Sequence, residues 1–460
     1  MTATSSASWV VTTRGEQWRS APDLEVMGVD GMPNVISKLD EPRQAVQGFG
    51  ACFSELGWTS LGLLDESDRE DVLRELFAPG GAGLGFGRMP IGANDFSRDW
   101  YSYDETPGDF ALEHFSIEGD LETLVPFIRA AQRYRPDLRM WASPWSPPTW
   151  MKTNGHYAAA VPAGIFAEVD NGITPEQVGA EGTDLFRLDE QHLAAYAAYF
   201  GRFIDAYREA GIRVEMVMPQ NEFNSAQPFP SCTWTPDGLR QFVAHLGPEM
   251  RKRGVEVFLG TLERADDRLA GDVLADPVAG PFVSGLGLQW EGKKALAALH
   301  RLHPGLTIYQ TEQECGDGRN DWRYAWYAWR LMKHFLAGGA NAYMYWNISL
   351  EEGGVSRWGW TQNSLVVVDP ATRSYRFTPD YYVLKHVAAF VQPGARFIDT
   401  WSFNGFDDQL VFANPDGSSV VVIRNDVNED VEVNIMLDGR MVAPTLPADS
   451  LSTIVVPPRG

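Results

Sequence analysis

Two glutamates, Glu222 and Glu312, each follow a short apolar run that is typical of a buried strand. The first run spans residues 214–218 and continues as Pro-Gln-Asn-Glu, and the second spans 306–310 and continues as Thr-Glu. If both strands belong to one parallel barrel, the two carboxyl groups could face each other across its open end. A single glutamate at such a position is more often a cap or a surface carboxylate, so the prediction depends on the two occurring together.

Two facing carboxyl groups suit the cleavage of a glycosidic bond. One carboxyl group protonates the leaving oxygen, while the other attacks the sugar or activates water. A separation of about 5–5.5 Å would allow a covalent glycosyl intermediate and retention of the anomeric configuration. An ionised Glu312 would keep Glu222 protonated until the first step is complete. Asn221, next to Glu222, could bond the sugar 2-hydroxyl group.

The elements that must position these glutamates alternate between strand and helix. The predicted strands span residues 49–53, 85–91, 138–143, 214–218, 255–261, 283–289, 306–310 and 340–345. This alternation favours an α/β fold, a (β/α)8 TIM barrel, whose active sites lie at the C-terminal ends of the strands. A doubly wound sheet is the alternative, but the chain lacks the Gly-rich turn of a dinucleotide site. In a ring of eight strands, the fourth and seventh face each other across the mouth.

Both ends of the chain have short strand-like segments instead. They lie within residues 8–40 and 409–456, where Asn414-Pro415-Asp416-Gly417 is a strong turn signal. We therefore predict a small β-sandwich domain formed by both termini. The predicted parts are N-terminal strands in 1–44, a catalytic barrel in 45–390 and the C-terminal sandwich in 391–460. Long loops at 92–120 and 155–190 would decide between a pocket and an open groove.

Composition limits the partners. The 38 basic and 61 acidic residues give a net charge of −23, which argues against nucleic acid or an anionic membrane as the main partner; the acidity could also serve solubility alone. Cys52, Cys232 and Cys315 have no zinc or disulfide spacing. We expect no metal and no cofactor, because two carboxyl groups suffice for the chemistry.

The N-terminus lacks the pattern of a secretion signal, and no apolar run reaches the roughly 18 residues of a membrane span. The expected location is cytoplasmic, or secreted if this sequence is a trimmed form. A cytoplasmic location would favour small imported glycosides and exo cleavage. Several of the 16 tryptophans fall near strand ends, where their flat faces would suit pyranose rings, although core packing explains some of them equally well.

Longer motifs resemble a known family. The matching segments are Gln47 to Gly50, Arg88 to Ser97, Ala142 to Gly155, Asn221-Glu222, Thr311-Glu312, Trp346-Asn347, Tyr382 to His386 and Pro393-Gly394. Together they resemble glycoside hydrolase family 30, which includes glucosylceramidases, β-glucosidases and β-1,6-glucanases. The likeness extends from about residue 45 to the C-terminus, and its long Ser-Pro-Trp segment is highly specific.

The resemblance implies a retaining mechanism in which Glu222 is the acid/base and Glu312 the nucleophile. It also implies that five residues line the subsite of the non-reducing sugar: Arg88, Asp95, Trp145, Asn221 and Trp346. Asp95 would bind two hydroxyl groups, and Arg88 would support a catalytic carboxylate. For Arg88, a purely structural buried salt bridge is an equal alternative.

Two departures bear on the substrate. Where glucosylceramidases have His-Trp-Tyr, this chain has Gln289-Trp290-Glu291, and the segment after Glu312 also differs. Both are closer to the β-1,6-glucanase branch, which puts a ceramide leaving group in doubt; Gln289 and Trp290 join the predicted substrate-binding residues. Glu314 competes weakly with Glu312 for the nucleophile role, because strand alternation would put both on one side.

The predicted function is therefore a retaining β-glycosidase acting on β-D-glucosides, with small or β-1,6-linked substrates. An endo-β-1,6-glucanase is the first alternative, a glucosylceramidase the second, and an inactive carbohydrate-binding protein a remote third. The sequence leaves the exact glycone and the oligomeric state open.

Overall fold

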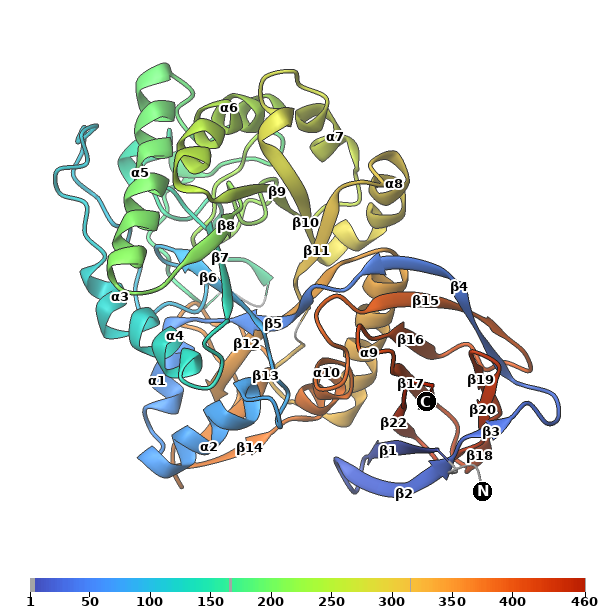
Figure 1. The fold of residues 1–460 in the computed structure, drawn as a ribbon. Helices are drawn as coiled ribbons and strands as arrows, with labels where there is room; N and C mark the ends of the chain where they lie inside the picture. The colour runs from blue at the N-terminus through green and yellow to red at the C-terminus, as the bar shows by residue number, and fades with distance from the viewer. Residues whose placement is uncertain (1–4, 165–167, 315, 460) are drawn as a thin grey trace.

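A computed structural model describes residues 5–164, 168–314 and 316–459. Within them, eight parallel strands form a closed barrel, because β11 pairs with β12 as well as with β10. In chain order these strands are β5 (Gly48–Cys52), β6 (Phe86–Ile91), β7 (Arg139–Pro144), β8 (Val214–Val217), β9 (Glu256–Leu262), β10 (Val283–Gln289), β11 (Thr307–Glu312) and β12 (Ala342–Glu351). The predicted TIM barrel is confirmed (Figure 1).

Helices follow the barrel strands and pack around them (Figure 1). They are α1 (Glu55–Leu61), α2 (Glu66–Phe77), α3 (Glu118–Glu122), α4 (Leu124–Gln132), α5 (Glu190–Glu209), α6 (Pro236–Arg253), α7 (Arg268–Leu274), α8 (Leu296–Leu302), α9 (Trp322–Ala337) and α10 (Pro379–Ala388). The side chains of Asp65, Asp189 and Asp321 each accept one free backbone N–H in the first turn of α2, α5 and α9, and so fix where these helices begin. A hairpin of β13 (Ser364–Asp369) and β14 (Ser374–Phe377) extends the sheet beyond β12.

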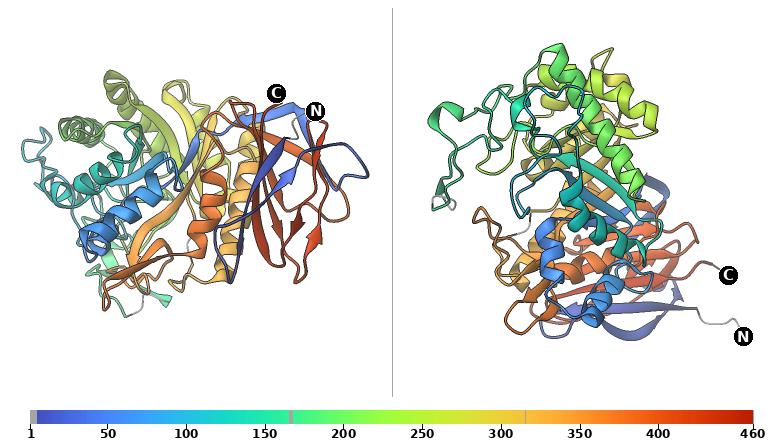
Figure 2. Two further views of the ribbon diagram at one scale, coloured as in Figure 1. Left: turned by 60° about the horizontal axis from the view of Figure 1, so that its bottom comes forward. Right: turned by 90° about the vertical axis from the view of Figure 1, so that its left-hand side faces the viewer.

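A second sheet joins the two ends of the chain, as predicted. Its order is β2 (Arg19–Glu25), β1 (Ser6–Thr13), β22 (Ser450–Val456), β17 (Ser419–Asn425), β16 (Gln409–Ala413), β15 (Arg396–Ser402), β4 (Val35–Ala45), β19 (Ile435–Leu437), β20 (Arg440–Val442) and β3 (Met27–Gly28). A two-stranded sheet of β18 (Val431–Glu432) and β21 (Thr445–Leu446) completes this β domain. Figure 2 shows the first strands of the chain, in blue, beside its last strands, in red. The domain boundaries remain predictions.

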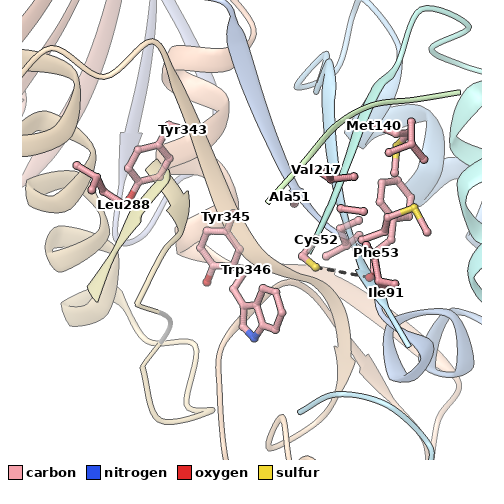
Figure 3. Close-up of a cluster of buried hydrophobic side chains, with 14 of the residues drawn as sticks. Ala51, Cys52, Phe53, Ile91, Met140, Val217, Leu288, Tyr343, Tyr345 and Trp346 are labelled. Carbon is pink, nitrogen blue, oxygen red and sulfur yellow. Dashed lines mark hydrogen bonds between the residues drawn. The ribbon is translucent and has the colours of Figure 1, made fainter. Parts of the chain in front are cut away.

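Two apolar layers hold the barrel. One lies between the strands and the helices, and Figure 3 shows part of it, with side chains such as Phe53, Ile91, Met140 and Tyr343. The other fills the barrel interior and consists of Phe86, Trp141, Met216, Met218, Phe258, Tyr309, Ala342 and Met344. Alternate residues of a strand face opposite sides. The residues of this interior layer therefore indicate which side chains nearer the C-terminal end of each strand point into the mouth.

Candidate active site

Glu222 and Glu312 meet at the C-terminal mouth of the barrel. One amide nitrogen, Nε2 of Gln289, donates to Oε1 of Glu222 at 3.1 Å and to Oε2 of Glu312 at 3.3 Å. The two oxygens therefore lie no farther apart than the sum of these distances, which is below the roughly 6.5–9.5 Å of inverting glycosidases. This upper bound accommodates the roughly 5–5.5 Å of retaining glycosidases.

A β-bulge turns Glu312 toward the mouth. Tyr309 of β11 points into the barrel interior, so simple alternation would place Thr311 inside and Glu312 outside. The pairing of β10 with β11 instead shifts by one residue, from Leu288–Gln310 to Gln289–Glu312. Thr311 is the extra residue, and its hydroxyl donates to the carbonyl of Leu288 at 3.2 Å. The bulge re-aims the side chain that follows it.

Glu222 lies in a turn after β8 that two neighbouring strands hold. Its φ of +47° is in the left-handed region, which costs a residue with a Cβ about 1–2 kcal/mol. Its backbone N–H donates to the hydroxyl of Thr261 at 2.8 Å, and Asn221 N–H donates to the carbonyl of Pro144 at 2.7 Å. These bonds to β9 and β7 hold the turn in its strained conformation.

Arg88 lies beneath the carboxyl groups and is fully buried. Its Nη1 donates to Oε2 of Glu312 at 2.7 Å, and its Nη2 donates to Oδ1 of Asn221 at 2.6 Å and to Ser143 at 3.1 Å. The guanidinium also lies 4.6 Å from the ring centre of Trp145. Because Arg88 occupies the amide oxygen of Asn221, the N–H groups of that amide are left for a ligand.

The surroundings separate the two carboxyl groups electrostatically. Burial, followed by the charge of Glu312, raises the pKa of Glu222 well above its ordinary value. Burial also raises the pKa of Glu312, but Arg88, Trp290 and Gln289 all donate to this carboxylate and oppose the shift. Since Glu312 alone is paired with a cation, it ionises first, and Glu222 keeps its proton.

A cavity of about 170 Å³ opens above these groups. It is lined by Asp95, Trp145, Asn221, Glu222, Gln227, Phe229, Glu263, Arg264, Trp290, Glu291, Glu312, Trp360 and Gln362. Six of the predicted site residues are therefore on its wall. The other three, Arg88, Gln289 and Trp346, lie behind the wall and contact residues that line it.

Among the buried polar atoms near the cavity that have no hydrogen-bond partner in the described residues are Oδ1 of Asp95 and Nε1 of Trp346. Asp95 lines the cavity, and the Trp346 ring stacks on Trp145 at 5.4 Å between ring centres. A buried acceptor and a buried donor without partners are costly unless a ligand satisfies them, and a sugar with several hydroxyl groups can do so.

Sequence reasoning did not single out five of the lining residues: Gln227, Phe229, Glu263, Arg264 and Gln362. Most lie on loops whose course the sequence does not indicate. Glu263 is different, because it directly follows β9 and so has the same strand-then-carboxylate pattern that identified Glu222 and Glu312. Glu314 does not line the cavity; it pairs with Lys293 and Tyr327, at 2.6 Å each.

The remaining observations concern the cysteines, metal-binding groups and membrane-spanning helices. Cys52 and Cys232 are buried free thiols, and Cys315 lies outside the described residues. In the described ranges, no group of three or more His, Cys, Asp or Glu side chains could hold a metal ion. None of the helices described is long and apolar enough to cross a membrane.

The chain is similar to several known proteins. The chain is 30% identical over 424 residues to the lysosomal acid glucosylceramidase of Mus musculus, covering 85% of this chain and 77% of that protein. It is 26% identical over 445 residues to an endo-1,6-beta-D-glucanase of Aspergillus fumigatus, covering 90% and 86% of the two chains. The structure of SrfJ from Salmonella typhimurium has the same fold, with a TM-score of 0.87, 22% identity and coverage of 99% and 100%.

The sequence model of the glycosyl hydrolase family 30 TIM-barrel domain matches residues 46–391. That match spans the barrel and every residue of the site described above. The fold, the paired carboxyl groups and this match lead to one conclusion: the protein is a glycoside hydrolase that belongs to family 30.

Proposed function

We propose that the protein is a retaining β-glycosidase that hydrolyses β-D-glucosides, with a small or β-1,6-linked sugar as leaving group. The observation that carries this proposal is the single amide of Gln289 bonded to both Glu222 and Glu312. It supports a carboxylate separation of the retaining type, and Arg88 distinguishes the ionised member of the pair.

The first step transfers the glucosyl group to the enzyme. A carboxylate oxygen of Glu312 attacks the anomeric carbon while Glu222 donates its proton to the glycosidic oxygen, so the C–O bond breaks and the leaving group departs as an alcohol. Trp290 Nε1, which donates to Oε1 of Glu312 at 3.0 Å, and Arg88 hold the nucleophile in place. Glu312 loses its charge when it becomes an ester.

The second step releases the sugar. Once Glu312 is an uncharged ester, its repulsion no longer raises the pKa of Glu222, so the ionised Glu222 acts as a base. It takes a proton from water, the hydroxide attacks the anomeric carbon, and Glu312 leaves as a carboxylate. Two inversions at one carbon give overall retention.

The cavity supports binding of one terminal sugar. Its volume of about 170 Å³ is below the roughly 300–1,000 Å³ typical of pockets for larger ligands. Asp95, Asn221 and Trp346 offer the acceptor and donors for the hydroxyl groups of the glycone, and Trp145 offers an apolar ring face. This favours removal of single glucose residues over cleavage inside a chain.

A substrate panel tests the proposed specificity. We expect a β-1,6-linked glucose disaccharide to have at least about a tenfold higher kcat/KM than glucosylceramide, because a charged wall does not favour an alkyl chain. The comparison also includes a β-1,6-glucan, on which release of glucose alone supports exo cleavage. A preference for glucosylceramide would favour the second alternative, and release of internal oligosaccharides would favour an endo-β-1,6-glucanase.

A further inference from the structure

A third carboxyl group lies in the wall of the active-site cavity. Glu263 follows β9 directly and is only 1% exposed. Its Oε1 accepts the backbone N–H of Asn224 at 3.1 Å and the hydroxyl of Ser225 at 3.0 Å. Its Oε2 is buried and has no hydrogen-bond partner among the described residues. One oxygen of Glu263 thus holds the turn that follows Glu222, and the other is available to a ligand.

Arg264 adds a donor next to this carboxylate. Its Nη1 lies 3.9 Å from Oε1 of Glu263, and its Nη2 pairs with Glu181 in the long segment between β7 and β8. The side chain is 34% exposed and also lines the cavity. Arg264 therefore links the cavity wall to the segment that contains Glu181.

The position of Glu222 indicates which part of a substrate would meet these two residues. The acid protonates the glycosidic oxygen, so the leaving group lies on the Glu222 side of the cavity. Glu263 bonds Asn224 and Ser225, which belong to the same turn as Glu222, and is therefore on that side. Asp95 and Trp145 are the groups proposed above for the glycone.

A lipid leaving group would fit this side poorly. It would cover the free oxygen of Glu263 with hydrocarbon, and burying a polar group without a hydrogen bond is unfavourable. A sugar hydroxyl can donate to that oxygen and accept from a guanidinium. Burial raises the pKa of Glu263 to about 7, and a carboxyl group in either protonation state keeps an acceptor for a hydroxyl.

We infer that Glu263 and Arg264 form the binding site for the leaving group, and that this group is a hydroxylated sugar. The inference rests on the proposed function of Glu222 and Glu312. It assigns substrate selection on this side of the scissile bond to two residues that take no part in bond cleavage.

The test compares two substrates with the same glycone. The first is a β-1,6-linked glucose disaccharide, and the second is phenyl β-D-glucoside, whose leaving group carries no further hydroxyl groups but needs the proton of Glu222 as the disaccharide does. We expect Glu263→Gln and Arg264→Met each to lower kcat/KM for the disaccharide at least about tenfold more than for the aryl glucoside, since a site that bonds hydroxyl groups is weakened by loss of a partner.

Glu314→Gln is the matched control, because Glu314 also follows a barrel strand but lies outside the cavity. This variant is expected to leave kcat/KM unchanged for both substrates. Equal losses for both substrates in the Glu263 and Arg264 variants would overturn the inference and assign them a structural role. No loss for either substrate would overturn it as well. If wild-type enzyme cleaves neither substrate, the proposed function itself fails, and the inference fails with it.

Discussion

Replacing Glu312 by Gln is expected to lower kcat for an aryl β-glucoside by about 10⁴-fold or more, the scale seen when a covalent nucleophile is removed. The amide keeps the shape of the side chain but cannot form the glycosyl ester. The ion pair with Arg88 at 2.7 Å is lost together with the charge. Steady-state hydrolysis of the aryl glucoside measures the effect.

Two further variants test whether the loss of activity arises from the missing nucleophile at position 312. Glu314→Gln should retain wild-type rates, because Glu314 bonds Lys293 and Tyr327 and does not line the cavity. Glu312→Ala leaves space for a small anion such as azide, which should restore turnover of an activated β-glucoside and give an α-glucosyl azide. A Glu312→Gln enzyme with near-normal kcat would remove Glu312 from the nucleophile role.

Glu222→Gln is expected to lower the rate of hydrolysis most for substrates whose leaving group needs a proton. For a disaccharide, loss of general acid catalysis should cost about 10²–10⁴-fold in kcat/KM. For 2,4-dinitrophenyl β-D-glucoside the first step needs no proton, so the loss in kcat/KM should be much smaller. A series of aryl glucosides with leaving groups of graded pKa measures the difference.

The pH dependence gives a second readout of the same variant. Wild-type kcat/KM for the disaccharide should fall at high pH as Glu222 loses its proton. Because burial and Glu312 raise the pKa of Glu222, this fall should lie well above the ordinary pKa of a glutamic acid. In Glu222→Gln this alkaline fall should disappear. Equal losses for all leaving groups, with an unchanged alkaline limb, would show that Glu222 is not the acid.

Much of the barrel was predictable because apolar runs and helical patterns alternate clearly. The fourth strand is predicted at 214–218 and lies at Val214–Val217, and the sixth is predicted and found at Val283–Gln289. Boundaries were less predictable. The eighth strand is predicted at 340–345 but is Ala342–Glu351, since the pairing of β12 with β13 extends it. That pairing depends on tertiary contacts that a local pattern does not contain.

The site was predictable where a side chain ends a strand and not where a local irregularity places it. Alternation alone would have put Glu312 outside the barrel, and only the register shift at Thr311 corrects this. Gln289 was predicted to bind substrate, whereas it lies fully buried between the two glutamates and bonds both. Its substrate-binding role remains a prediction; its position depends on how three strand ends converge.

The most direct test of the paired carboxyl groups identifies the anomer of glucose that is released first from a β-glucoside. Proton NMR spectra recorded before mutarotation measure it. Two carboxyl groups held by the same amide nitrogen predict that β-glucose appears first and α-glucose only later, as the product equilibrates. If α-glucose appears first, water attacks the substrate directly, and the assignment of Glu312 as nucleophile is wrong.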